Sequence, residues 1–130
     1  QKEKIAMVHK RRQFGDKGEK IAKEFLTKKG MIVCAENYRT PFGEIDLVAQ
    51  KGGELIFIEV KTRRTTTFGR PEESVTPSKV QHILRSGEHY MQMHKWVDKP
   101  WRIDVVAILL LEGKDPEIVH YTHIDNPYGF

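Results

Sequence analysis

The segment from Ile103 to Leu111 constrains the fold most, because it is apolar at every position except Asp104. A run of this kind is typical of a strand that is covered on both faces of its sheet. A chain of 130 residues is long enough to provide that cover within one compact domain. The segment therefore predicts a sheet with other elements packed on both sides.

Two amphipathic segments supply the expected cover. Phe14 to Lys29 has apolar residues at helical spacing and ends at Gly30, and Pro77 to about Trp96 carries a second apolar stripe after the cap residue Thr76. The segments with β-type patterns are 31–35, 45–50, 54–63, 103–111 and 117–123. The order α-β-β-β-α-β-β predicts an α/β sandwich in which two helices flank one mixed sheet of about five strands.

Composition narrows the class of protein. Lys and Arg number 22 against 18 Asp and Glu, and the formal charge of +4 fits either a nucleic-acid partner or an ordinary basic surface. Residues 1–12 are rich in Lys and Arg, so we expect a basic N-terminal arm before a single domain at 13–130. Cys34 is the one cysteine, which excludes an internal disulfide and a Cys-based zinc site. Because no apolar run is long enough to span a bilayer, we expect a soluble, cytoplasmic protein without a membrane partner.

Lys51-Gly52-Gly53 separates two β-type segments and predicts a hairpin turn. Counting back from this turn sets Val48 against Phe57, Asp46 against Glu59 and Glu44 against Lys61. Side chains alternate along a strand, so these residues share one face of the hairpin. The other face is predicted to be core and carries Ile45, Leu47, Ile56, Ile58 and Val60.

The predicted neighbours Asp46 and Glu59 indicate a metal site. Directly opposed side chains lie about 4.5–5.5 Å apart at Cβ, where two like charges repel unless a cation or proton lies between them. Carboxylate oxygens suit Mg²⁺ or Mn²⁺, ions that orient water and stabilise charge on phosphate. Lys61 shares their face and is placed to polarise that water or to offset the charge. The alternative is a salt bridge between Glu44 and Lys61 on a solvated face, with Asp46 and Glu59 as ordinary surface acids.

Other charged residues extend the candidate site. Glu19 falls on the sheet-facing side of the first helix, and Lys79 lies in the first turn of the second, where a helix N-terminus attracts phosphate. Loop arginines that are candidates for phosphate contacts are Arg63, Arg64 and Arg70. The alternatives are a favourable charge–dipole interaction for Glu19 and plain solvation for the basic residues.

Arg102 and Asp104 are two residues apart on one strand, where we expect a structural ion pair. The sequence has six histidines, but they lack the HExxH spacing of a zinc site. We therefore interpret the histidines as solvated side chains.

Six motifs together resemble the YraN-like family, and the resemblance covers most of the chain. They are Gly15-Asp16-Lys17-Gly18-Glu19, Asn37-Tyr38-Arg39, Gly43-Glu44-Ile45-Asp46, Phe57-Ile58-Glu59-Val60-Lys61-Thr62-Arg63, Phe68-Gly69 and Arg102-Ile103-Asp104. That family is grouped with the restriction-endonuclease-like, or PD-(D/E)xK, superfamily, which includes archaeal Holliday-junction resolvases. The resemblance thus implies a restriction-endonuclease-like α/β/α sandwich.

The resemblance also implies roles for four residues. Asp46 and Glu59 would bind the metal, Lys61 would be the catalytic lysine, and Glu19 matches the helix acid of resolvase-like members. Ile45 stands where the superfamily pattern often has a proline.

The sequence as a whole favours a Mg²⁺- or Mn²⁺-dependent endonuclease that hydrolyses phosphodiester bonds with water as the nucleophile. DNA is the favoured substrate, with branched DNA included, and residues 13–130 would form one nuclease-like domain. Two alternatives stay open: a nucleic-acid-binding module of nuclease fold without turnover, and a protein-interaction or assembly factor. The sequence also leaves open a homodimer.

Overall fold

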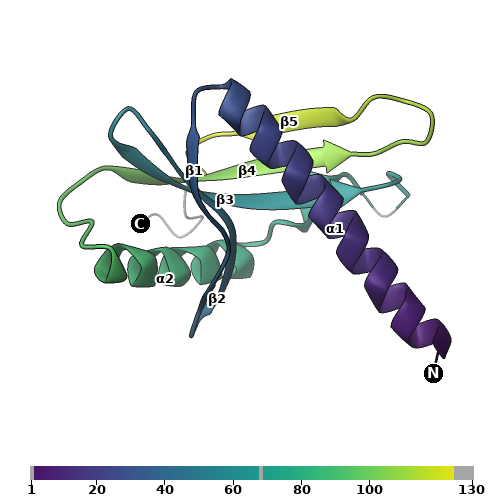
Figure 1. Cartoon of the computed structure of the whole chain (residues 1–130), viewed down its shortest axis with the longest axis horizontal. Coiled ribbons are helices and arrows are strands. Elements are labelled where there is room, and N and C mark those ends of the chain that lie inside the picture. The colour runs from purple at the N-terminus through teal and green to yellow at the C-terminus, as the bar shows by residue number, and fades with distance from the viewer. Residues whose placement is uncertain (1, 68, 125–130) are drawn as a thin grey trace.

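The computed structural model describes residues 2–67 and 69–124, with side chains described from residue 12. The helices are α1 (Lys2–Lys28), the short 3₁₀ helix η1 (Pro71–Ser74) and α2 (Pro77–Met93). The strands are β1 (Ile32–Thr40), β2 (Gly43–Lys51), β3 (Glu54–Arg63), β4 (Trp101–Leu109) and β5 (Glu117–Tyr121). Their order confirms the predicted α/β architecture (Figure 1).

The five strands form one mixed sheet in the order β1-β2-β3-β4-β5. Only the β3–β4 pair is parallel among these strands, and α2 lies in the crossover that connects them. The crossover places β4 in the interior of the sheet, where it is buried at nearly every position. Most of the long apolar segment is therefore a covered strand, as predicted, although the strand begins at Trp101 and ends at Leu109 instead of spanning 103–111.

Each face of the sheet has its own hydrophobic core. One core lies under α1 and includes Leu26, Leu47 and Ile58, while the other lies under α2 and includes Val48, Phe57 and Ile83. Val48 and Phe57 are fully buried, so the hairpin face that was expected to be free for chemistry is mostly core. A functional site can lie only where this second core ends.

Helix α1 and strands β1 and β2 are longer than predicted, and β2 runs from Gly43 to Lys51 instead of 45–50. Helix α1 begins at Lys2 rather than Phe14, because the residues before Phe14 are mainly good helix formers without Gly or Pro. The backbone of residues 2–11, expected as part of a basic arm, is helical. Strand β1 continues past Ala35 to Thr40, because Tyr38, Arg39 and Thr40 pair with β2 although Asn37 between them and Glu36 has a positive φ. No helix in the described part of the chain is long and apolar enough to cross a bilayer.

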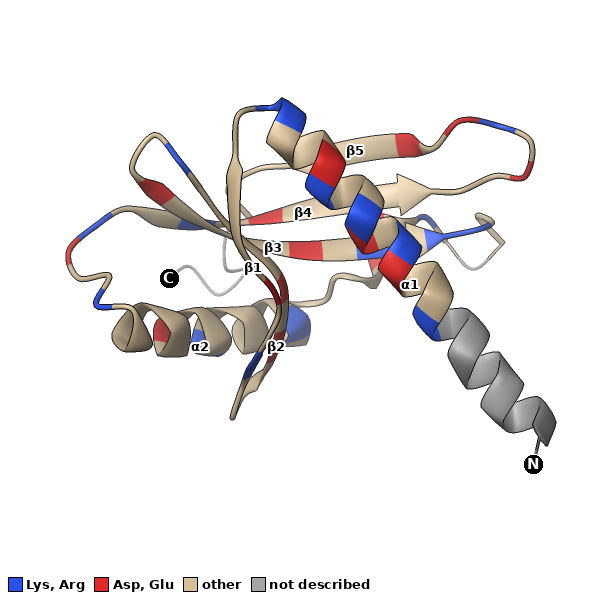
Figure 2. Cartoon of the chain, in the orientation of Figure 1, with Lys and Arg blue, Asp and Glu red and all other residues tan. Residues whose placement is uncertain are grey.

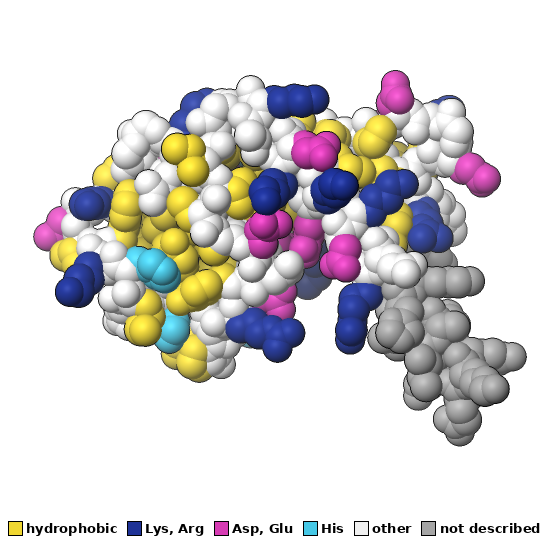
Figure 3. Space-filling view, viewed as in Figure 1, with side chains coloured by type: hydrophobic (Ala, Val, Ile, Leu, Met, Phe, Trp, Pro, Cys, Tyr) yellow, Lys and Arg dark blue, Asp and Glu magenta, His cyan; other side chains and the backbone are white. Residues whose placement is uncertain are grey.

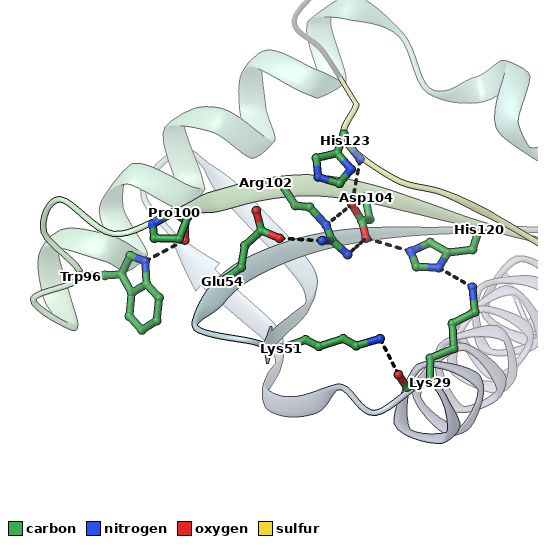
Figure 4. A network of polar contacts seen from close by, with 9 residues as sticks. All are labelled: Lys29, Lys51, Glu54, Trp96, Pro100, Arg102, Asp104, His120 and His123. Atoms are coloured by element: carbon green, nitrogen blue, oxygen red, sulfur yellow. Dashed lines mark hydrogen bonds and ion pairs between the residues drawn. The ribbon is translucent and has the colours of Figure 1, made fainter.

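A polar network centred on the buried Asp104 joins β4, β5 and Lys29, which follows α1, and it reaches β3 because Arg102 also pairs with Glu54 (Figure 4). The Asp104 carboxylate is fully buried and accepts hydrogen bonds from Arg102 Nε at 3.0 Å and from the backbone N of His123 at 3.1 Å. His120 Nε2 lies 2.8 Å from Asp104 Oδ2, and His120 Nδ1 lies 2.9 Å from Lys29 Nζ. The Arg102–Asp104 ion pair is confirmed. The prediction that His120 is solvated is wrong, because its side chain is only 4% exposed.

Burial acts to raise the pKa of Asp104, but hydrogen bonds from His120, Arg102 and the His123 backbone outweigh it and hold this pKa below its ordinary value. We expect Asp104→Ala to lower the free energy of unfolding by about 3–5 kcal/mol, because it leaves Arg102 without its buried partner. Urea denaturation measures the change. The matched control is Asp115→Ala, which removes an exposed acid of the β4–β5 loop and should cost less than about 0.5 kcal/mol. Equal effects of the two substitutions would contradict a stabilising role for the network.

Candidate functional site

The site begins where β2 separates from β3. The β2–β3 register runs from Lys51↔Glu54 to Leu47↔Ile58, and it confirms the predicted Val48–Phe57 pair. Beyond Leu47 no further β2–β3 backbone pairs are formed in the described structure, while β2 stays paired with β1 as far as Gly43. Figure 1 shows β1 and β2 bending away together from β3. The predicted backbone pairs Asp46–Glu59 and Glu44–Lys61 are therefore wrong.

The Asp46 side chain bridges the gap between the separating strands. Its Oδ2 accepts a hydrogen bond from the backbone N of Val60 at 2.8 Å. The Asp46 carboxylate thus accepts the hydrogen bond from a backbone N–H of β3 that would have bonded to β2 if the two strands had stayed paired. Ile45 packs in the α2-side core and Leu47 in the α1-side core, so β2 also changes the face that it presents at Asp46.

Glu59 and Lys61 complete the centre of the site from β3. Lys61 Nζ lies 3.1 Å from Glu59 Oε1, and the Glu59 side chain is 14% exposed. The alternative pairing of Lys61 with Glu44 is not formed. Glu44 Oε2 instead lies 3.9 Å from Arg39 Nε on the neighbouring strand, as its pairing with β1 requires.

Asp46 and Glu59 remain electrostatic neighbours although their backbones are not paired. Burial, and next the Glu59 charge, raise the pKa of Asp46 to about 8, against an ordinary value of 3.8. The hydrogen bond from Val60 and the Lys61 charge act in the opposite direction but do not cancel this rise. Asp46 therefore keeps its proton near neutral pH unless a cation replaces it.

Helix α1 brings Glu19 to this pair. A Cβ on Gly18 would collide with Thr62 Oγ1, so only glycine lets α1 approach β3 this closely. Glu19 follows directly, and its charge contributes to the raised pKa of Asp46. The pKa of Glu19 is also raised above its ordinary value, mainly by burial. A hydrogen bond from the Asn37 side chain acts in the opposite direction but does not cancel this rise.

Asn37 is the residue near this site that sequence reasoning missed. It lies in β1 with a φ of 48° and holds its side chain toward Glu19. In the sequence, Asn37 is marked only by the motif Asn37-Tyr38-Arg39, which contributes to the family resemblance but does not indicate a role for Asn37.

Helix α2 brings Lys79 from the opposite side. Its backbone N donates to the N-cap Thr76 Oγ1 at 3.3 Å, which fixes it in the first turn. Its side chain meets Lys61, and this contact lowers the pKa of Lys79. The pKa of Lys61 is raised above its ordinary value. Burial acts to lower this pKa, but the charge of Glu59 and hydrogen bonds to neighbouring side chains outweigh burial.

The three loop arginines separate in the structure. The charge of Arg63 acts on Lys79, so Arg63 belongs to the α2 side of the site. Arg64 instead lies over the Phe14 ring, 4.4 Å from its centroid. Arg70 is held by Glu72 and Glu117, and these ion pairs connect η1 to β5.

The charges are distributed in an ordered way around the site. In Figure 2, acidic positions of β2 and β3 lie between α1 and the basic start of α2. Figure 3 shows acidic side chains gathered beside the middle of α1, with Lys and Arg side chains around them. The geometry therefore places two acids and a lysine at the centre, a third acid on α1 and a second lysine on α2.

The raised pKa of Asp46 predicts a pH effect on stability. The folded protein holds a proton that the unfolded chain loses above pH 3.8, so the free energy of unfolding should fall as the pH rises from there toward about 8. Asp46→Asn keeps an oxygen for the Val60 N–H but cannot ionise, so it should remove this fall. Urea denaturation in metal-free buffer across this pH range measures both proteins. Parallel pH profiles would contradict the assignment.

Comparison with known proteins identifies relatives in several bacteria. Residues 18–108 match the model of the uncharacterised protein family UPF0102, and this range contains Glu19, Asp46, Glu59, Lys61 and Lys79. A UPF0102 protein of Dehalococcoides mccartyi is 45% identical over 102 residues, which cover 78% of this chain and 84% of the relative. A UPF0102 protein of Dictyoglomus thermophilum is 39% identical over 117 residues, which cover 90% of this chain and 98% of the relative. The chain therefore belongs to the uncharacterised protein family UPF0102.

Proposed function

We propose that the protein is a metal-dependent endonuclease of restriction-endonuclease-like fold that cleaves DNA, branched DNA included. One observation carries the proposal: Asp46 and Glu59 are neighbours in a partly buried site beside Lys61, where burial and the Glu59 charge raise the pKa of Asp46. Paired acids of this kind gain stability from a divalent cation, which supplies charge that a proton otherwise provides.

The residues present fit Mg²⁺ or Mn²⁺. Within the described residues, no group of three or more His, Cys, Asp or Glu side chains is arranged to hold a metal ion. Mg²⁺ is commonly bound by one or two carboxylates, with water and substrate phosphate completing its shell, so Asp46 and Glu59 suffice. When bound, the metal would lower the pKa of a water and stabilise negative charge on the phosphate.

The chain's own residues have separable tasks in this proposal. Asp46 is oriented by the Val60 N–H, and Glu59 is held by Lys61, so both acids are fixed before substrate arrives. Lys61 is placed to hold the attacking water or to offset charge that grows on the phosphate. Lys79 and Arg63 offer positive charge to the DNA backbone from the α2 side. Glu19 adds a third acid from α1 and increases the need for a cation.

The choice of DNA rests on charge and on the resemblance of the motifs to resolvase-like nucleases. The formal charge of +4 supports a polyanionic partner. The same charge also fits the rival function, a nucleic-acid-binding module without turnover. The rival predicts salt-sensitive DNA binding without cleavage or metal binding.

The first test is cleavage of labelled duplex, single-stranded and four-way-junction DNA with Mg²⁺ or Mn²⁺. We expect metal-dependent cleavage of at least one substrate, and Asp46→Asn and Glu59→Gln should each lower the rate at least about 100-fold. The matched control is Glu44→Gln, which changes a nearby β2 acid that pairs with Arg39 and should keep the wild-type rate. Full activity in either site variant would contradict the assigned roles.

The second test is metal binding by calorimetry in two buffers of different ionisation enthalpy. Mg²⁺ bound by Asp46 and Glu59 displaces the proton that Asp46 holds near pH 7, so binding at this pH should release a proton. Asp46→Asn should weaken binding and abolish the release, whereas Glu44→Gln should leave both unchanged. Binding without proton release would place the metal elsewhere.

A further inference from the structure

A groove on the α1 side of the sheet lies outside the acid site. It has a volume of about 780 Å³ and is bounded by α1, the residues after β3 and the β4–β5 loop. Phe14 and Lys17 line it from α1, Arg64 from the end of β3, and Leu111 and Lys114 from the loop. Its volume falls in the range of about 300–1,000 Å³ that is usual for ligand sites.

The groove combines cations with apolar surface. Its charged lining consists of Lys17, Arg64 and Lys114 against the single acid Glu112. Leucine and phenylalanine side chains form much of the remaining wall. Cations beside apolar surface suit a nucleotide, whose phosphate is charged and whose base is planar and largely apolar.

Arg64 is the residue best placed to contact a base. Its guanidinium lies over the Phe14 ring, so this planar cation is already positioned before any ligand binds. The Arg64 side chain remains exposed to solvent. A nucleic-acid base can stack on a guanidinium plane only when the face of the base is free. This condition is met by unpaired bases, which are not stacked within a duplex.

The end of β3 connects the groove to the acid site. Side chains alternate there, so Lys61 and Arg63 lie on the α2 side while Thr62 and Arg64 meet α1. Arg64 follows Lys61 by three residues, a distance of about 10 Å along a strand. A nucleic-acid strand that passes over this strand end meets positive charge on both sides.

We propose that the groove binds unpaired nucleotides of the DNA strand that runs to the acid site, with a base stacked on Arg64. This inference rests on the proposed function for the identity of the strand. It adds a preference for DNA with a single-stranded segment next to the cleavage position. Lys17 and Lys114 contact the phosphates of that segment.

The test is equilibrium binding by fluorescence anisotropy with the whole chain and EDTA, so that cleavage does not intervene. The probes are a blunt DNA duplex, the same duplex with a single-stranded tail, and a tailed duplex whose tail is abasic. We expect the wild type to prefer the tailed duplex. Arg64→Ala should weaken binding of the tailed duplex about tenfold and reduce the salt slope by about 0.7.

Two further variants separate stacking from charge. Arg64→Lys keeps the charge but loses the planar group, so it should keep the salt slope and lose the preference for the normal tail over the abasic tail. Arg85→Ala is the matched control, because it removes an exposed arginine of α2 away from the groove, and it should keep the tail preference. Since Arg64 and Arg85 are both exposed, these variants should fold, and circular dichroism checks this.

The outcomes distinguish the groove from the nuclease proposal. Equal binding of blunt and tailed duplexes would overturn the proposed nucleotide site in the groove, and so would equal effects of Arg64→Ala and Arg85→Ala. Neither result would contradict metal-dependent cleavage at the acid site. Loss of tail preference in Arg64→Ala without cleavage of any substrate by the wild type would support the groove and overturn the nuclease. A fourth probe carries an RNA tail in place of the DNA tail, and a preference for this probe would overturn the assignment of the groove to DNA.

Discussion

The hydrogen bond from the Val60 backbone N to Asp46 Oδ2 is the interaction on which the site depends. It lies at the point where β2 leaves β3, and it fills the position of a missing backbone hydrogen bond. Without it, Val60 would keep an unpaired donor beside the core and Asp46 would lose its orientation. One side chain thus completes the sheet and presents a carboxylate at its opening.

The sequence alone predicts much of the hairpin and fails at this bond for a physical reason. The glycines at 52 and 53 fix the turn, and the register follows as far as Leu47 and Ile58 because each strand residue advances by a constant step. Counting residue pairs outward from the turn assumes that β2 and β3 stay paired along the whole hairpin. It cannot show that a side chain will compete with the backbone for the Val60 N–H, so the proximity of Asp46 and Glu59 was predicted through pairs that do not form.

Contacts between distant segments explain the remaining differences. The approach of Glu19 depends on Gly18 packing against Thr62, which periodicity within α1 suggests but cannot establish. The burial of His120 depends on Asp104 in the neighbouring strand and Lys29 after α1. The division of Arg63 and Arg64 between two faces follows from strand alternation, but it becomes visible only when α1 and α2 are in place.

In the described part of the chain, the fully buried Asp104 and the partly buried Asp46 have surroundings with opposite effects. Asp104 receives hydrogen bonds from Arg102 and the His123 backbone and contacts His120, and its pKa is lowered. Asp46 lies beside Glu59 and Glu19 with one backbone donor, and its pKa is raised to about 8. The first carboxylate is satisfied within the protein and stabilises the fold. The second completes the sheet through Val60 but lies beside two other acids, so it lacks the positive charge that a bound cation would supply.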